Sequence, residues 1–178
     1  KRSLAGLRRY WEGEYASREE SRKEFREAAT REIGELTERE ILIAGAIAYW
    51  CEGTKAKPWR QTGVHVTFMN SDPGLIRFFL RFLDVAGIQH ADLVFRVHVH
   101  ESADVEAAQR FWAEVTGAPA DQFRKVTLKR HNPKTVRKNT GEAYHGCLIV
   151  YVRRSGDLYR SIEGWMSAIT ADPAYGSV

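Results

Sequence analysis

An uncharged stretch of the chain runs from Ile41 to Cys51 and reads ILIAGAIAYWC. Thr37 and Glu40 precede it with the spacing of a capping box, and Gly53 follows it, so the sequence predicts one helix between them. A helix that is apolar on all sides is buried on more than one side. This helix is too short to cross a bilayer, which takes about 20 apolar residues. We therefore expect other helices to pack against it.

The apolar positions elsewhere alternate between strand spacing and helix spacing. Period-two alternation predicts a strand at 93–100, and the sequence also predicts strands at 64–70, 123–130 and 146–153, the last from its β-branched and aromatic composition. Helical spacing predicts helices at 72–85, 104–116 and 158–169. Asp72 ahead of Pro73 is typical of an N-cap, and Ser102 or Asp104 would cap the second of these helices. Together the elements predict an α+β fold, a twisted antiparallel sheet with helices on one face.

The predicted strand at 93–100 has two different faces. One face is apolar and consists of Leu93, Phe95, Val97 and Val99, and the other consists of Val94, Arg96, His98 and His100. The second face is basic, and we expect it to be open, as a sheet that faces nucleic acid would be.

Residues 1–35 are highly charged, with acidic and basic side chains at helical spacing. This pattern predicts a solvated helical arm or linker. The folded domain is predicted to cover 36–170, and 171–178 is predicted to be a loose tail. Because the chain begins at Lys1 without a methionine, we expect further residues upstream.

The charge of the chain is unevenly distributed. The net charge is +4 and the isoelectric point is about 9.1. Ten basic and ten acidic residues cancel within residues 1–40, so the remainder carries the excess. Two acid-free windows hold most of the remaining bases: Lys55, Lys57 and Arg60 in one, and Arg124, Lys125, Lys129, Arg130, Lys134, Arg137 and Lys138 in the other. A charged run is usually a solvated face, but two windows without compensating acids favour a polyanionic partner.

Both cysteines, Cys51 and Cys147, lie in apolar runs, which indicates free thiols and a reducing cytoplasm. No signal peptide or membrane span is visible in the sequence. We therefore expect a cytoplasmic, nucleoid-associated protein that does not interact with membranes.

Small residues in the apolar helix, Ala44 and Gly45, are followed by Glu52 and Gly53 at its end. This pattern resembles the motif of the LAGLIDADG homing endonucleases and their DNA-binding relatives. In that family two such helices pack side by side, and each delivers its acidic residue to a shared metal site between two DNA strands. The strand that ends in Asn70 and leads directly into an aromatic-rich helix is also similar to the family.

The resemblance, which covers residues 36–88, implies a homing-endonuclease-like fold. Because the chain carries one motif, it also implies a homodimer whose two-fold axis passes between the motif helices. The interface residues would be Ala44, Gly45, Ile47, Ala48 and Cys51. Double-stranded DNA would lie on the open sheet face, contacted by Lys55, Lys57, Arg60, Arg96, His98, His100, Lys129, Arg130, Lys134, Arg137 and Lys138.

Three residues are candidates for catalysis. Glu52 at the end of the motif helix would hold Mg²⁺ together with its twin, and the alternative is a surface carboxylate paired with Lys55. Asn70 would orient water or read a base, unless it is a turn residue ahead of the next helix. Lys129 would stabilise charge on the cleaved phosphate, unless it is a plain phosphate contact.

Two functions follow from these observations. The retained acid favours a site-specific, Mg²⁺-dependent DNA endonuclease. The glycine, which lies further from Glu52 than in the usual motif, favours a non-catalytic DNA-binding regulator with the same fold. An RNA-binding or RNA-processing protein is a third, weaker alternative.

Overall fold

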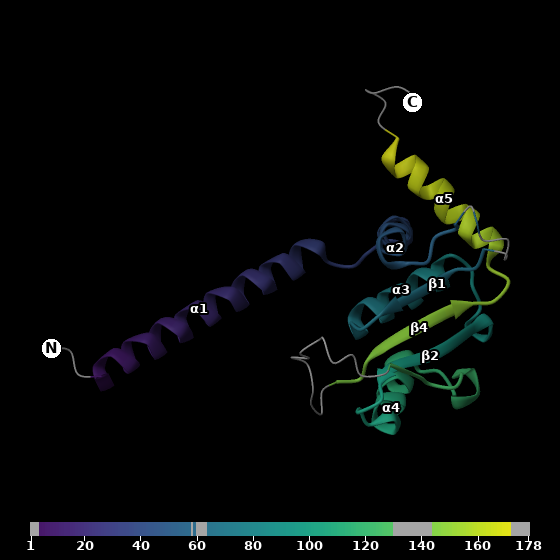
Figure 1. Ribbon diagram of the computed structural model, residues 1–178. Coiled ribbons are helices and arrows are strands. Elements are labelled where there is room, and N and C mark those ends of the chain that lie inside the picture. Colours follow the sequence, from purple (N-terminus) through teal and green to yellow (C-terminus); the bar gives the residue numbers. More distant parts are fainter. Residues whose placement is uncertain (1–3, 58, 60–63, 130–143, 172–178) are drawn as a thin grey trace. The chain divides into compact units, whose positions relative to one another are not determined.

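The computed structural model describes residues 4–57, 59, 64–129 and 144–171 (Figure 1). The chain divides into two compact units, residues 1–37 and residues 38–178. The predicted tail at 171–178 lies outside the described residues except for Ala171.

The first unit contains the predicted charged helix, α1, which spans Leu4–Ile33. Ion pairs one helical turn apart join Arg8 to Glu12 and Glu14 to Arg18 along its surface. Such exposed pairs stabilise a helix only modestly, by about 0.3–0.5 kcal/mol each. The helix therefore depends on its local sequence for much of its stability.

The second unit is an α+β fold, as predicted. Its elements in chain order are α2 (Glu38–Glu52), β1 (Thr67–Asn70), α3 (Pro73–Val85), η1 (His90–Asp92), β2 (Leu93–His100), α4 (Val105–Thr116), η2 (Ala120–Gln122), β3 (Thr127–Lys129), β4 (Cys147–Val152) and α5 (Gly156–Thr170). The four strands form one sheet in the order β1-β4-β2-β3, so that β4 lies between β1 and β2 (Figure 1).

The sheet is mixed, and the prediction of a wholly antiparallel sheet is wrong for one pair. β4 runs antiparallel to both β1 and β2, but β2 and β3 are parallel. The physical reason is that α4 connects β2 to β3. Parallel strands need such a crossover, because the chain must return to the end of the sheet at which the first strand began. β3 is also shorter than the predicted strand, because η2 forms before it and Phe123 makes only an isolated bridge to Phe95.

The helix caps follow the local sequence. Oδ1 of Asp72 accepts a hydrogen bond from the Leu75 amide at 2.9 Å, and Oδ1 of Asp104 accepts one from the Ala107 amide at 2.9 Å. Asp104, and not Ser102, is therefore the cap of α4. Gly117 ends that helix in the left-handed conformation, with φ of 65°.

Helices cover one face of the sheet. The Phe68 ring of β1 stacks on Phe79 of α3 with centroids 4.1 Å apart, and Tyr49 of α2 stacks on the same Phe79 ring at 6.1 Å. Phe82 of α3 meets Trp165 of α5 edge to face at 6.0 Å. α4 packs on both α3 and β2. Along β4, the buried residues that face this layer alternate with half-buried residues on the opposite face, which no described helix covers.

Gly45 is the closest point of contact between α2 and α3. A Cβ atom built on Gly45 would lie 2.2 Å from Cδ2 and 2.7 Å from Cβ of Phe82. The Phe82 ring thus occupies the space that a side chain at position 45 would need. Gly45 is buried inside its own subunit, so its predicted place in a dimer interface is wrong.

We expect Gly45→Ala to destabilise the protein by about 1–3 kcal/mol, because the added methyl overpacks the Phe82 contact. Gly164→Ala is the matched control, since that helical glycine has no atom within 4 Å of a built Cβ. The control should gain about 0.5–1 kcal/mol from helix propensity. Urea denaturation measures both, and Phe82→Leu should restore part of the stability that Gly45→Ala removes. Equal stability of the two glycine variants would refute the packing role.

Candidate nucleic-acid interface

The face of the sheet opposite the helices carries polar and basic side chains. Strand alternation places Thr67 and Met69 of β1, Arg96 and His98 of β2, and Tyr151 of β4 on this open face. The predicted basic face of β2 is therefore confirmed at Arg96, which is exposed, and at His98, which is half-buried.

A hollow of about 590 Å³ lies on the open face, and we call it the arginine hollow. Its lining residues are Thr67, Val94, Arg96, Arg124, Ile149, Tyr151 and Arg153. Strand register explains its floor, because Tyr151 pairs with Thr67 on one side and with Val94 on the other. Arg96 pairs with Ile149 in the same way. The hollow thus spans β1, β4 and β2.

Arg124 and Arg153 reach the hollow from outside the strands, and the start of β2 holds both in place. The Arg124 amide donates to the Phe95 carbonyl at 2.8 Å, and the Arg153 amide donates to the Asp92 carbonyl at 2.9 Å. These backbone hydrogen bonds fix the backbone positions from which the two arginine side chains extend.

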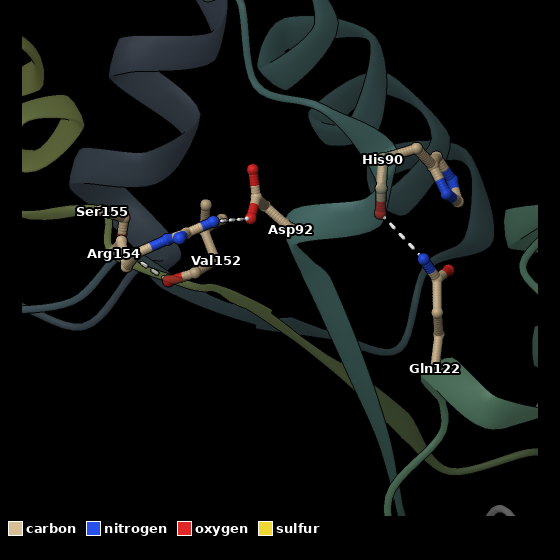
Figure 2. A network of polar contacts seen from close by, with 6 residues as sticks. All are labelled: His90, Asp92, Gln122, Val152, Arg154 and Ser155. Carbon is tan, nitrogen blue, oxygen red and sulfur yellow. Dashed lines mark hydrogen bonds and ion pairs between the residues drawn. The ribbon is translucent and has the colours of Figure 1, made fainter.

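A set of side-chain contacts reinforces these two anchors (Figure 2). Arg154 donates to Asp92 with 2.7 Å between Nη2 and Oδ1, next to the anchored Arg153. Gln122 donates from Nε2 to the His90 carbonyl at 2.9 Å, two residues before Arg124. In Figure 2 the two contacts lie on opposite sides of η1, so η1 ties both arginine-bearing segments to β2.

The three arginines of the hollow have no partner among the described residues. None of Arg96, Arg124 and Arg153 forms an ion pair or side-chain hydrogen bond with another described residue, and the described lining of the hollow contains no acidic residue. Nearby, desolvation lowers the pKa of His98, and the positive charges of Lys129 and Arg96 lower this pKa further. The imidazole therefore reports a local excess of positive charge.

The β3 edge adds one more cation. Lys129 is exposed and pairs in register with His100. His100 itself is only 5% exposed, and its Nδ1 lies 2.9 Å from Oγ of Ser102. His100 therefore offers little surface to a nucleic acid, contrary to the prediction, because its side chain is buried.

Glu52 is the last residue of α2 and is exposed. Tyr49 fixes the chain just after it, since the Tyr49 hydroxyl donates to the Thr54 carbonyl at 2.6 Å. A Cβ on Gly53 would lie 2.4 Å from the Tyr49 ring, so only glycine fits there. Burial raises the pKa of Tyr49 to about 12, which keeps this hydroxyl protonated.

Glu52 forms no ion pair with another described residue. The predicted alternative, an ion pair between Glu52 and Lys55, is therefore absent among the described residues. The Lys55 ammonium instead lies over the Trp50 ring, 5.7 Å from its centroid. Lys57 lies in the same way over Trp59 at 5.8 Å. Both lysines are exposed, and the two pairs are cation–π contacts.

The three predicted catalytic residues do not come together within one chain. Gly53 bridges to Phe68 of β1, which places Glu52 beside one edge of the sheet, whereas Lys129 belongs to β3 at the other edge. Three strand spacings of about 4.8 Å separate those edges by roughly 14 Å. Asn70 uses its Oδ1 to accept from the Asp72 amide at 2.8 Å, which is the turn role. Glu52 and Lys129 of one chain therefore lie at opposite edges of the sheet.

One side of α2 remains exposed although it is apolar. Ile43 is 37% exposed, Ile47 is 40% exposed and Trp50 is 36% exposed, and Cys51 is exposed beside them. These positions follow helical spacing and lie opposite the buried side of α2. Ile43 also lines an apolar groove of about 470 Å³ shared with Trp165 and Ile169 of α5. Of the predicted interface residues, Ile47 and Cys51 lie on this exposed side, and Ala44 and Ala48 are half-buried.

Sequence reasoning missed part of this site. Tyr151 and Arg153 were not among the expected contacts, although Cys147, Ile149, Tyr151 and Arg153 alternate along β4 toward the open face. Assigning alternate residues of the predicted strand at 146–153 to the open face would have found them. Other predicted contacts lie outside the described residues: Arg60, Arg130, Lys134, Arg137 and Lys138.

Within the described ranges, no three His, Cys, Asp or Glu side chains gather into a group that could hold a metal ion. Among the helices that the structure describes, none combines the length and apolar character that crossing a membrane requires. The chain has no significant match among protein-family models, curated proteins or solved structures.

Proposed function

We propose that this protein is a LAGLIDADG-like, homodimeric DNA-binding protein that holds duplex DNA on the open face of its sheet. The observation that carries the proposal is a group of three guanidiniums, those of Arg96, Arg124 and Arg153, which have no described ion-pair partner and lie on a face that no described helix covers. Unpaired cations on an open surface gain most from a polyanion, because phosphate contacts release condensed counterions.

The dimensions of the sheet agree with this partner. Four strands span roughly 14 Å, and the major groove of B-DNA is about 12 Å wide. Lys129 at the β3 edge and the arginine hollow spread positive charge across most of that width. Phosphates on both sides of a groove could therefore contact one sheet.

The exposed apolar side of α2 supports the homodimer. Ile43, Ile47, Trp50 and Cys51 present neighbouring apolar surface at helical spacing. A two-fold axis beside Ile47 and Cys51 would cover this surface with its own copy, as isologous interfaces do. It would also place two open sheet faces side by side along one DNA duplex.

A second candidate function is Mg²⁺-dependent cleavage of DNA, and the exposure of Glu52 favours it. Mg²⁺ binds proteins through one or two carboxylates together with phosphate oxygens, and an exposed carboxylate can supply such a ligand. Glu52 is the last residue of α2, so an axis that passes close to the C-terminal end of this helix would bring two Glu52 carboxylates together. With DNA phosphates this set fits a magnesium ion, which would supply Lewis-acid activation of the phosphodiester.

We expect the combined variant Arg96→Gln, Arg124→Gln and Arg153→Gln to weaken duplex binding regardless of sequence. The slope of log affinity against log salt should flatten by about 0.9 for each phosphate that the variant no longer neutralises. Fluorescence anisotropy with a labelled duplex at several salt concentrations measures both, and an RNA hairpin competitor tests the RNA alternative. Arg77→Gln on the exposed surface of α3 is the matched control and should change neither quantity. A salt slope that is unchanged in the triple variant would refute binding by this face.

We expect the protein to be a dimer, and Ile47→Glu to produce folded monomers, because Ile47 is exposed in the single chain. Light scattering measures the mass and circular dichroism checks the fold, with Leu128→Glu as an exposed control. Mild oxidation should also join two chains through Cys51, so Cys51→Ser should lose the cross-link while Cys147→Ser keeps it. A monomeric wild type, or an Ile47→Glu variant that stays dimeric, would contradict this assembly.

Glu52→Gln separates the two candidate functions. If the protein cleaves DNA, this variant should lose Mg²⁺-dependent nicking of plasmid DNA and keep its affinity for duplex, since the substitution preserves shape and removes the metal ligand. Calorimetric titration of Mg²⁺ into the protein–DNA complex should show binding for the wild type only. Wild-type protein that binds DNA without nicking it or taking up Mg²⁺ would leave the non-cleaving function.

A further inference from the structure

The arginine hollow combines two chemistries that plain duplex binding does not use together. Its rim is cationic, formed by Arg96, Arg124 and Arg153, and its floor is largely apolar, formed mainly by Val94, Ile149 and Tyr151. We propose that the hollow binds a single unpaired nucleotide of a DNA strand, with the base on Tyr151 and the phosphates on the arginines. This inference rests on the proposed DNA binding and specifies the DNA structure that the site prefers.

The rim is suited to phosphate. A guanidinium is planar and makes paired hydrogen bonds to two phosphate oxygens. Arg124 and Arg153 come from segments that hydrogen bonds fix to the two ends of one stretch, Asp92 to Phe95. Three guanidiniums around one hollow, without an acidic partner among the described residues, repel each other, and a bound phosphate removes that repulsion.

The floor is suited to a flat, apolar group. Tyr151 lies at its centre, paired in register with Thr67 and Val94 on the two neighbouring strands. The His65 ring lies 5.4 Å from the Tyr151 ring at an angle of 51°, which places a second ring beside the floor. Aromatic side chains on open sheets bind bases by stacking, and every base has a face that can stack.

A paired nucleotide would not use this floor. In a duplex the faces of the bases are covered by their neighbours, and only base edges and phosphates reach a protein surface. An unpaired nucleotide at a bulge or strand end can turn its base out. The hollow of about 590 Å³ lies within the range of about 300–1,000 Å³ that small-ligand sites occupy.

The test compares three labelled DNAs: a blunt duplex, the same duplex with a one-nucleotide bulge, and the bulged duplex with an abasic nucleotide. The wild type should bind the bulge about ten-fold more tightly than the blunt duplex. The abasic bulge should lose that preference, because only the base can stack.

Tyr151→Ala should abolish the preference, measured as the ratio of the affinities for the bulged and the blunt duplex, and Tyr151→Phe should retain it. Met69→Ala is the matched control, since Met69 is exposed on the same face but does not line the hollow. Equal affinity of the wild type for bulged and blunt duplexes, or a preference that survives Tyr151→Ala, would overturn the nucleotide site. In both of those outcomes salt-dependent binding of the blunt duplex persists, so the proposed function stands.

A separate arm uses small probes and does not require duplex binding. A nucleoside monophosphate should shift the NMR signals of the Tyr151 ring, and inorganic phosphate at the same concentration should not. If the nucleotide binds but no duplex does, the proposed function fails and the nucleotide site stands. Equal effects of phosphate and nucleotide would reduce the hollow to an anion site and overturn the inference.

Discussion

The contact between Gly45 of α2 and the Phe82 ring of α3 is the constraint on which the architecture depends. The absence of a side chain at position 45 lets the two helices approach until aromatic rings fill the layer between helices and sheet. Tyr49 and Phe68 both stack on Phe79 in that layer, so one glycine fixes the position of α2 relative to β1. Interiors are packed densely, and such a contact has little freedom to relax.

Two consequences follow for the surface of the protein. The apolar strand residues that contact the helices are buried on one face of the sheet. The arginine hollow lies on the other face, which no described helix covers. α2 uses only its Gly45 side for internal packing, which leaves Ile47 and Cys51 exposed on its far side. The same packing therefore produces the proposed DNA face and the proposed dimer face.

The positions of the acidic and basic groups favour binding over chemistry within one chain. Glu52 stands at the β1 edge, held in place by the Tyr49 hydroxyl, and the cations gather over β4, β2 and β3. Charge attraction to a phosphate falls with distance and is screened within about 8–10 Å in physiological salt. A cation at the β3 edge thus lies too far from Glu52 of the same chain to stabilise charge there.

The sequence by itself determined the elements whose signals are local. The caps Asp72 and Asp104, the alternation of 93–100 and the end of the motif helix at Gly53 depend on neighbours within a few residues. The direction of β3, the burial of Gly45 and the distance between Glu52 and Lys129 depend on strand order and helix packing. These three features arise from contacts between residues far apart in the sequence, and the spacing of neighbouring residues does not predict them. Tyr151 and Arg153 belong to both classes, because alternation puts them on the open face, but only the register of β4 between β1 and β2 makes a hollow there.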